Sequence, residues 1–302
     1  MKNGKIVGVV NQKGGDGKST VNTLLANCIH SEFSDSTNII VYDLDDFQQT
    51  LMSKRNEELE IIKNSLNAER ILNAVKSKES LSKEDELFIE NRKERLKKES
   101  QIVYEGMLKR AKDPSKVKYK EIPNDRLTKE EKEACKASKL DYYKLVSMSS
   151  ADFTTQVEVL KENYDFIFVD IPGNLKQEGV IDVYQYLDYA FIPVNDSWSE
   201  IDSTKKFIDK YLEIVEFRRE HGFETKVFGF FCRVKSTSKI FSELYVTKND
   251  LSIWKIPFLE NYVPENDQAF KMAFSTIVPY SNKKGDDYKE ILAEMLTILF
   301  EN

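Results

Sequence analysis

A glycine-rich loop near the N-terminus constrains the fold more than any other feature. The loop, KGGDGKST at residues 13–20, follows a short apolar run at residues 5–10. After the loop, apolar side chains recur at helical spacing: Val21, Leu24, Leu25, Cys28 and Ile29. A strand, a glycine loop and a helix in this order are the setting in which a chain binds phosphate groups through its backbone. We therefore predict a phosphate-binding loop at residues 13–20.

The residue types of the loop fit this chemistry. Glycine adopts positive φ values and lets the backbone come close to phosphate oxygens. Successive N–H groups at the start of a helix then attract an anion. We expect Lys18 to contribute charge to the β- and γ-phosphates and Ser19 to ligate Mg²⁺. The other residues expected to contact the nucleotide are Lys13, Gly14, Gly15, Asp16, Gly17 and Thr20.

Several other segments have strand or helix character. Short apolar runs that predict buried strands lie at residues 38–42, 166–169, 189–194, 226–231 and 254–258. Helical patterns lie between or after them, at residues 199–220, 238–250 and 287–300. Strands that alternate with helices are typical of a parallel sheet covered on both faces. We predict an α/β fold with a mostly parallel twisted sheet and helices on both faces.

The segment at residues 52–150 differs from the rest. It is dense in Lys and Glu and has almost no strand character. Its clearest pattern, at residues 83–112, is that of an exposed helix with a narrow apolar stripe. A structureless stretch of this length inside a compact domain is uncommon. We therefore predict one domain over residues 1–302 with a charged helical insertion at 52–150. Its charge fits either a solvated surface or a partner-docking arm.

Bulk charge and cysteine usage limit the classes of function. The net charge of −6 excludes a chain that is basic as a whole, so any contact with DNA needs a local basic face. The three cysteines lie far apart and form no CxxC pair, which indicates a reducing cytoplasm. We expect a cytoplasmic protein that associates with the nucleoid if it binds DNA. Candidates for a basic face are Lys205, Lys206, Lys210, Arg218, Arg219, Arg233, Lys235 and Lys239.

The loop has a lysine, Lys13, where the usual phosphate loop has its first glycine. This KGGxGK[ST] form resembles the deviant Walker A box of the ParA, MinD and MipZ ATPases. The resemblance implies that Lys13 reaches the nucleotide of a facing subunit in an ATP-sandwich dimer. Asp16 departs from the family pattern, in which small or apolar residues are usual at this position.

Further motifs carry the same resemblance. Asp43-Leu44-Asp45 is similar to the DxD switch of the family, and DIPG at residues 170–173 resembles its Walker B and switch II segment. The resemblance implies that Asp43 and Asp170 hold Mg²⁺ and that Asp45 orients the attacking water; an exchange of roles between Asp43 and Asp45 is the alternative. Residues 193–197 resemble the corresponding segment of MipZ, and residues 262–264 resemble the loop that holds adenine in the family. The residues implied at the base are Cys232, Arg233 and Pro264.

The resemblance implies a function as well. It predicts a ParA-like ATPase that hydrolyses ATP with Mg²⁺ slowly, as an ATP-dependent homodimer, in DNA partition or in the positioning of cellular machinery. Lys13, Lys18 and Asp45 are the catalytic residues expected. Non-specific DNA and a ParB-like stimulator are the expected partners. The acidic C-terminal helix argues against a membrane partner. The alternative is an adaptor of a mobile element or conjugation system, whose nucleotide-bound state scaffolds protein partners.

Overall fold

The computed structural model describes residues 3–12, 15, 17–45, 49–174, 177–265, 275–277 and 286–301. The chain divides into two compact units. The first unit comprises Met1–Asn56 and Tyr142–Asn302, and the second comprises Glu57–Asp141. The predicted organisation, one domain over residues 1–302 with an insertion at 52–150, remains a prediction.

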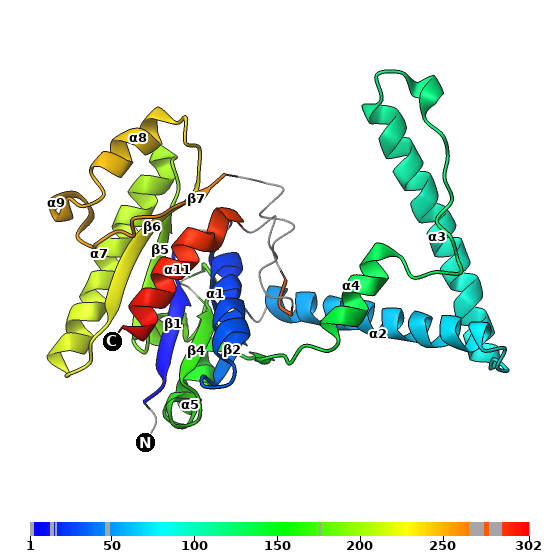
Figure 1. Cartoon of the computed structure of the whole chain (residues 1–302). Helices are drawn as coiled ribbons and strands as arrows, with labels where there is room; N and C mark the ends of the chain where they lie inside the picture. Colours follow the sequence, from blue (N-terminus) through cyan, green and yellow to red (C-terminus); the bar gives the residue numbers. More distant parts are fainter. Residues whose placement is uncertain are drawn as a thin grey trace. The chain divides into compact units, whose positions relative to one another are not determined.

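A parallel sheet forms the centre of the first unit (Figure 1). In the described residues it has seven strands in the order β3-β2-β4-β1-β5-β6-β7. All of the strand pairs run parallel, which confirms the predicted α/β fold. The strands are β1 Lys5–Val9, β2 Ile39–Asp43, β3 Lys144–Ser147, β4 Phe166–Asp170, β5 Tyr189–Val194, β6 Lys226–Val234 and β7 Val263–Pro264.

Helices cover both faces of this sheet, because successive side chains of a strand point to opposite faces. Val7 and Val9 of β1 belong to the apolar cluster that includes α1 Lys18–Phe33 and α11 Asp286–Phe300. Ile6 and Val10 belong to the cluster on the other face. The helices that contribute to that cluster are α5 Ser150–Asn163, α6 Val180–Tyr184, α7 Trp198–Glu220, α8 Lys239–Val246 and α9 Leu251–Trp254.

Two secondary-structure predictions were wrong. The apolar run at 254–258 is no strand: Trp254 ends α9, and Phe258 makes an isolated parallel bridge to Gly229. Short apolar runs do not distinguish a buried helix end from a strand. Lys144–Ser147 was expected to be part of the helical insertion but forms β3, at the edge of the sheet beside β2. Pairing with β2, rather than local propensity, decides its conformation.

The second unit is helical. It contains most of α2 Thr50–Lys76, which begins in the first unit, together with α3 Lys83–Arg110 and α4 Lys129–Ala137. The helix predicted at residues 83–112 is therefore confirmed to within two residues at its end. Capping boxes start α3, at Ser82, and α4, at Thr128. In such a box two side chains satisfy N–H groups that the helix leaves unpaired.

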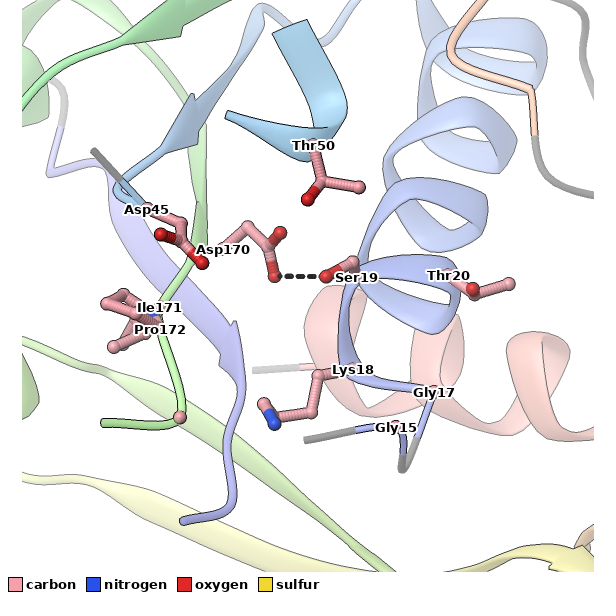
Figure 2. Close-up of a pocket in the computed structure, with 11 residues that line it drawn as sticks. Gly15, Gly17, Lys18, Ser19, Thr20, Asp45, Thr50, Asp170, Ile171 and Pro172 are labelled. Atoms are coloured by element: carbon pink, nitrogen blue, oxygen red, sulfur yellow. Dashed lines mark hydrogen bonds between the residues drawn. The ribbon is translucent and has the colours of Figure 1, made fainter. Parts of the chain in front are cut away.

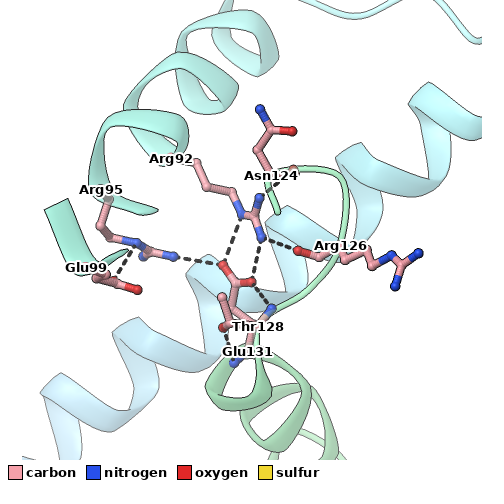
Figure 3. Close-up of polar contacts among 7 residues, drawn as sticks. All are labelled: Arg92, Arg95, Glu99, Asn124, Arg126, Thr128 and Glu131. Carbon is pink, nitrogen blue, oxygen red and sulfur yellow. Dashed lines mark hydrogen bonds and ion pairs between the residues drawn. The ribbon is translucent and has the colours of Figure 1, made fainter. Parts of the chain in front are cut away.

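A buried ion pair holds α3 and α4 of the second unit together (Figure 3). The Nε and Nη2 atoms of Arg92 donate to the two carboxylate oxygens of Glu131, over 3.1 and 2.7 Å. Arg92 also donates to the carbonyls of Asn124, over 2.8 Å, and Arg126, over 2.7 Å. The side chains of Arg92 and Glu131 are 5% and 6% exposed. The guanidinium thus connects α3, the following loop and α4.

Glu131 has further partners. The N–H of Thr128 donates to its Oε2 over 2.8 Å, and Arg95 donates to its Oε1 over 2.8 Å. Burial alone raises the pKa of Glu131, but the hydrogen bonds from Arg92 and Thr128 outweigh burial and hold the pKa below its usual range. Glu131 is therefore an ionised, fully bonded carboxylate at the centre of the unit.

Candidate functional site

Several of the predicted site residues meet at the carboxyl edge of the sheet. The glycine loop follows β1, Asp45 follows β2, and Asp170 ends β4. In open α/β sheets, ligands bind outside this edge. A cavity of about 280 Å³ lies there (Figure 2). It is lined by Gly15, Gly17, Lys18, Ser19, Thr20, Asp45, Thr50, Asp170, Ile171, Pro172 and Gly173.

The described part of the loop has the backbone that its glycines predict. Gly15 has φ 87° and Gly17 has φ 85°, and both values lie in the left-handed region that favours glycine. Gly17 precedes the first turn of α1, so Lys18 and Ser19 stand at the positive end of a helix dipole. The side chain of Lys18 lines the cavity and is largely buried. Lys13, Gly14 and Asp16 lie outside the described residues.

Ser19 and Asp170 bring oxygen atoms together at this edge. The hydroxyl of Ser19 donates to Oδ1 of Asp170 over 2.9 Å (Figure 2). Burial, together with the charges of Asp43 and Asp45, raises the pKa of Asp170 to about 7, although the hydrogen bond from Ser19 and the charge of Lys18 act to lower it. A hydroxyl and a carboxylate are hard oxygen ligands of the kind that Mg²⁺ takes. A divalent cation would also offset the repulsion among the three carboxylates, so these residues fit the ion.

Asp43 has a different environment from the one expected of a metal ligand. It is fully buried and is not among the described residues that line the cavity. Its Oδ2 accepts the N–H groups of Leu51 and Met52 over 3.0 and 3.1 Å, and its Oδ1 accepts that of Asp45 over 3.3 Å. Burial raises the pKa of Asp43, and these hydrogen bonds counteract it. Asp43 therefore anchors the start of α2 and the backbone of Asp45.

Thr50 is a cavity residue that the sequence reasoning missed. It is the first residue of α2, and its hydroxyl points into the space that Ser19 and Asp170 face (Figure 2). A hydroxyl residue at a helix start usually indicates only a cap. The available signal was its position five residues after Asp45, in a segment that the DxD motif already marked.

The residues expected at the adenine base lie elsewhere in the unit. Cys232 is buried in β6 opposite Val263, and Val234 pairs with Pro264. Cys232, Arg233 and Pro264 are not among the described residues that line the cavity. Arg233 nevertheless reaches the loop, because its Nη1 donates to the carbonyl of Gly15 over 2.9 Å. Its φ of 58° is strained for a residue with a side chain, a feature that often marks functional sites.

Several side chains of the basic face expected in the C-terminal half have partners within the fold. The prediction that Arg218 contacts DNA was wrong. Arg218 is buried and donates hydrogen bonds to the carbonyl of Leu187 and, over 3.4 Å, to the carboxylate of Asp188. A buried charge needs such partners, which only the folded chain could reveal. Other members of the predicted face are also engaged. Their partners are Glu216 for Arg219, Glu265 for Lys235 and the Trp254 ring for Lys205.

The all-parallel sheet and the loop at its carboxyl edge define the class of protein as a P-loop NTPase. Comparison with known families narrows this class. The family model described as an AAA domain, AAA_31, matches residues 4–218, and the chain belongs to this family. Among curated proteins, no sequence match was found at a significant level. In the part of the chain that the structure describes, no helix combines the length and the apolar composition needed to cross a bilayer.

Solved structures share the fold at low sequence identity. A chain of the MinC:MinD cell division protein complex of Aquifex aeolicus has a TM-score of 0.52 and 18% identity, and the match covers 99% of this chain and 97% of that one. Apo McdA of Cyanthece has a TM-score of 0.51 and 15% identity, and the match covers 98% of this chain and 99% of that one. A plasmid partition protein of Borrelia burgdorferi has a TM-score of 0.50 and 16% identity, and the match covers 98% of this chain and 100% of that one. The fold is thus that of the ParA/MinD ATPases, as the motifs predicted.

Proposed function

We propose that this chain binds ATP with Mg²⁺ in the cavity at the carboxyl edge and hydrolyses it slowly, as a nucleotide-switched dimer. The observation that carries the proposal is the convergence of Lys18, Ser19, Asp45 and Asp170 on one cavity. Phosphoryl transfer depends on positioning and on charge stabilisation rather than on covalent catalysis. A buried lysine, a helix N-terminus and oxygen ligands supply both.

Each residue has a proposed role. Lys18 neutralises the β- and γ-phosphates, and Ser19 and Asp170 hold Mg²⁺. Mg²⁺, when bound, supplies charge that offsets the negative charge of the transferring phosphoryl group. Asp45 orients the attacking water. We assign Asp43 to positioning instead of the metal role expected from the DxD motif, since its oxygens already accept the N–H groups of Asp45, Leu51 and Met52.

The cellular role that we propose is partition of DNA or positioning of cellular machinery, with non-specific DNA and a stimulator protein as partners. The names of the structural relatives, a plasmid partition protein and a cell division complex, support this role. The second candidate is the adaptor, and the compact unit Glu57–Asp141 favours it. ATP turnover in the presence of Mg²⁺, measured with and without duplex DNA, tests the proposal. Turnover that is absent under both conditions would favour the adaptor.

The first test concerns Asp45. We expect Asp45→Ala to keep ATP bound but to slow hydrolysis, because the variant loses the group that positions water and keeps those that bind phosphate. A positioned acid–base or orienting group contributes about 10²–10⁴-fold to the rate. Release of phosphate in single turnover measures the effect, and titration calorimetry checks the affinity. Asp182→Ala, an exposed carboxylate of α6, is the control. A normal rate in the Asp45 variant would rule out this role.

The second test concerns the dimer. Lys13 lies outside the described residues, and its role rests on the resemblance to the ParA/MinD loop. Two γ-phosphates that face each other repel, and a lysine from the opposite subunit offsets that repulsion. We expect Lys13→Ala to remain a monomer with a non-hydrolysable ATP analogue while still binding it. Light scattering gives the mass. If the variant forms the same dimer as the wild type, Lys13 does not act across the interface.

A further inference from the structure

One part of the second unit carries an unusual concentration of positive charge. Residues 97–120, which we call the basic hairpin, contain seven lysines, Arg110 and three acidic residues. Their net charge is +5 in a chain whose net charge is −6. All eight basic side chains are exposed. Lys116 makes an ion pair, with Asp113 over 3.4 Å, and the other seven positive charges face solvent.

The hairpin brings two basic segments side by side. The second half of α3 forms one side, and the chain that follows it runs back along the helix (Figure 1). The rings of Tyr104 and Tyr119 pack edge to face at 5.4 Å, and the N–H of Ile122 donates to the hydroxyl of Ser100 over 2.8 Å. Along α3, Lys98 and Lys109 are about 17 Å apart at the rise of an α-helix. The positive charge is therefore spread along an elongated surface.

No apolar core opposes the repulsion among these charges. Every residue from 101 to 130 is exposed or only half-buried. Val103 and Met107 are 55% and 52% exposed, although they continue the face that buries Leu96. Ordering such a segment costs conformational entropy, and the contacts within the segment offset only part of this free-energy cost. A bound polyanion would offset the repulsion and stabilise the hairpin.

We propose that the basic hairpin is a docking surface for the phosphate backbone of nucleic acid. Lysine is depleted in protein–protein interfaces, whereas exposed lysines are typical phosphate contacts that act as point charges. A helix that lies on a membrane needs one continuous apolar face. Here Ile102 shares a face with Lys98 and Lys109, whereas Val103 and Met107 lie on another. The distribution of charge thus favours nucleic acid over a lipid surface.

This inference assigns a site to the non-specific DNA of the proposed function, and it does not depend on the proposed ATPase. The basic hairpin and the cavity share no residue, and the hairpin lies in the unit Glu57–Asp141. Binding is therefore sequence-independent and occurs without nucleotide.

The test measures binding of a fluorescein-labelled DNA duplex by anisotropy, with the full chain, without nucleotide and over a series of salt concentrations. The variant K109Q/R110Q/K112Q removes three charges. Each phosphate contact contributes about 0.9 to the slope of log affinity against log salt, so the slope should become shallower by about 2 to 3. We expect the affinity at low salt to fall at least about tenfold. The matched control K129Q/K132Q/K136Q removes three exposed charges from α4 and should bind like the wild type.

A second variant protects the test against a loss of helix structure. K112Q/K118Q/K120Q leaves α3 untouched and should weaken binding in the same way. The proposal is overturned if the wild type does not retain the duplex at low salt, or if the α4 control loses as much affinity as the hairpin variants. It is also overturned if phosphatidylserine vesicles or polyglutamate bind to the hairpin and the DNA duplex does not. The same holds if light scattering shows that the charges of the hairpin contribute only to self-association of the chain. Addition of ATP and Mg²⁺ to the wild type should leave the affinity for the duplex unchanged; binding that occurs only with ATP would overturn the proposal.

Discussion

Lys18→Ala is expected to lose measurable ATP binding. The side chain of Lys18 lines the cavity and is only 8% exposed, so its charge acts on the phosphates with little screening by water. Removing one partner of a buried charge pair costs about 2–5 kcal/mol. A loss of about 2 kcal/mol corresponds to a roughly 30-fold fall in affinity. A loss of about 5 kcal/mol would weaken micromolar binding so far that titration calorimetry no longer detects it.

Titration calorimetry with ATP and Mg²⁺ measures the loss, and circular dichroism checks that the variant is folded. Lys206→Ala is the matched control, because Lys206 is an exposed lysine of α7 outside the cavity. It should bind ATP like the wild type. Wild-type affinity in Lys18→Ala would mean that residues 13–20 are not the phosphate loop, and the proposed function would fail with it.

Arg92→Ala is expected to destabilise the second unit by about 3–5 kcal/mol, the usual cost of removing one partner of a buried pair. The variant leaves Glu131 buried with less than its full set of donors, and it leaves the carbonyls of Asn124 and Arg126 without the guanidinium. Hydrogen exchange of the amides in α3 and α4 reports on the opening of this unit alone. We expect their protection to fall by at least about 100-fold.

The control for this prediction is Arg70→Ala. Arg70 also forms an ion pair, with Asp85 over 2.5 Å, but its side chain is 58% exposed. Exposed pairs contribute at most about 1 kcal/mol, so protection should change little. The double variant Arg92→Met, Glu131→Leu should recover part of the loss, since replacing both charges leaves no unpaired carboxylate. Equal effects of Arg92→Ala and Arg70→Ala would show that the buried pair does not hold the unit together.

Local patterns in the sequence predicted the features that depend on neighbouring residues. The glycines at 15 and 17 permit the positive φ that a phosphate loop uses, and both adopt it. The strands at β1, β2, β4, β5 and β6 are continuous apolar runs, because a parallel sheet covered on both faces excludes water along its whole length. Acids placed directly after such strands can only emerge at the carboxyl edge. Asp45 and Asp170 are therefore found in the cavity.

Features that depend on distant parts of the chain could not be predicted in this way. Lys144–Ser147 becomes a strand because β2 offers it hydrogen bonds. Arg218 is buried because Leu187 and Asp188, about thirty positions away, provide partners. Arg92 meets Glu131 across 39 positions. In each case a polar or charged residue looks like a solvated surface residue until the fold places its partner beside it.

The sequence by itself predicted a phosphate-binding loop at 13–20, and it determined the parallel sheet and the acids at the edge of that sheet, because these follow from backbone geometry and from the direction of parallel strands. Only the tertiary structure decided how the acids differ. Asp43 and Asp45 are two residues apart in one motif, yet Asp43 accepts the backbone N–H groups of α2 while Asp45 lines the cavity. Asp43 is the last residue of β2, whereas Asp45 lies beyond the end of the strand. Burial, which only the folded chain sets, then decides which carboxylate supports the fold and which one faces the cavity.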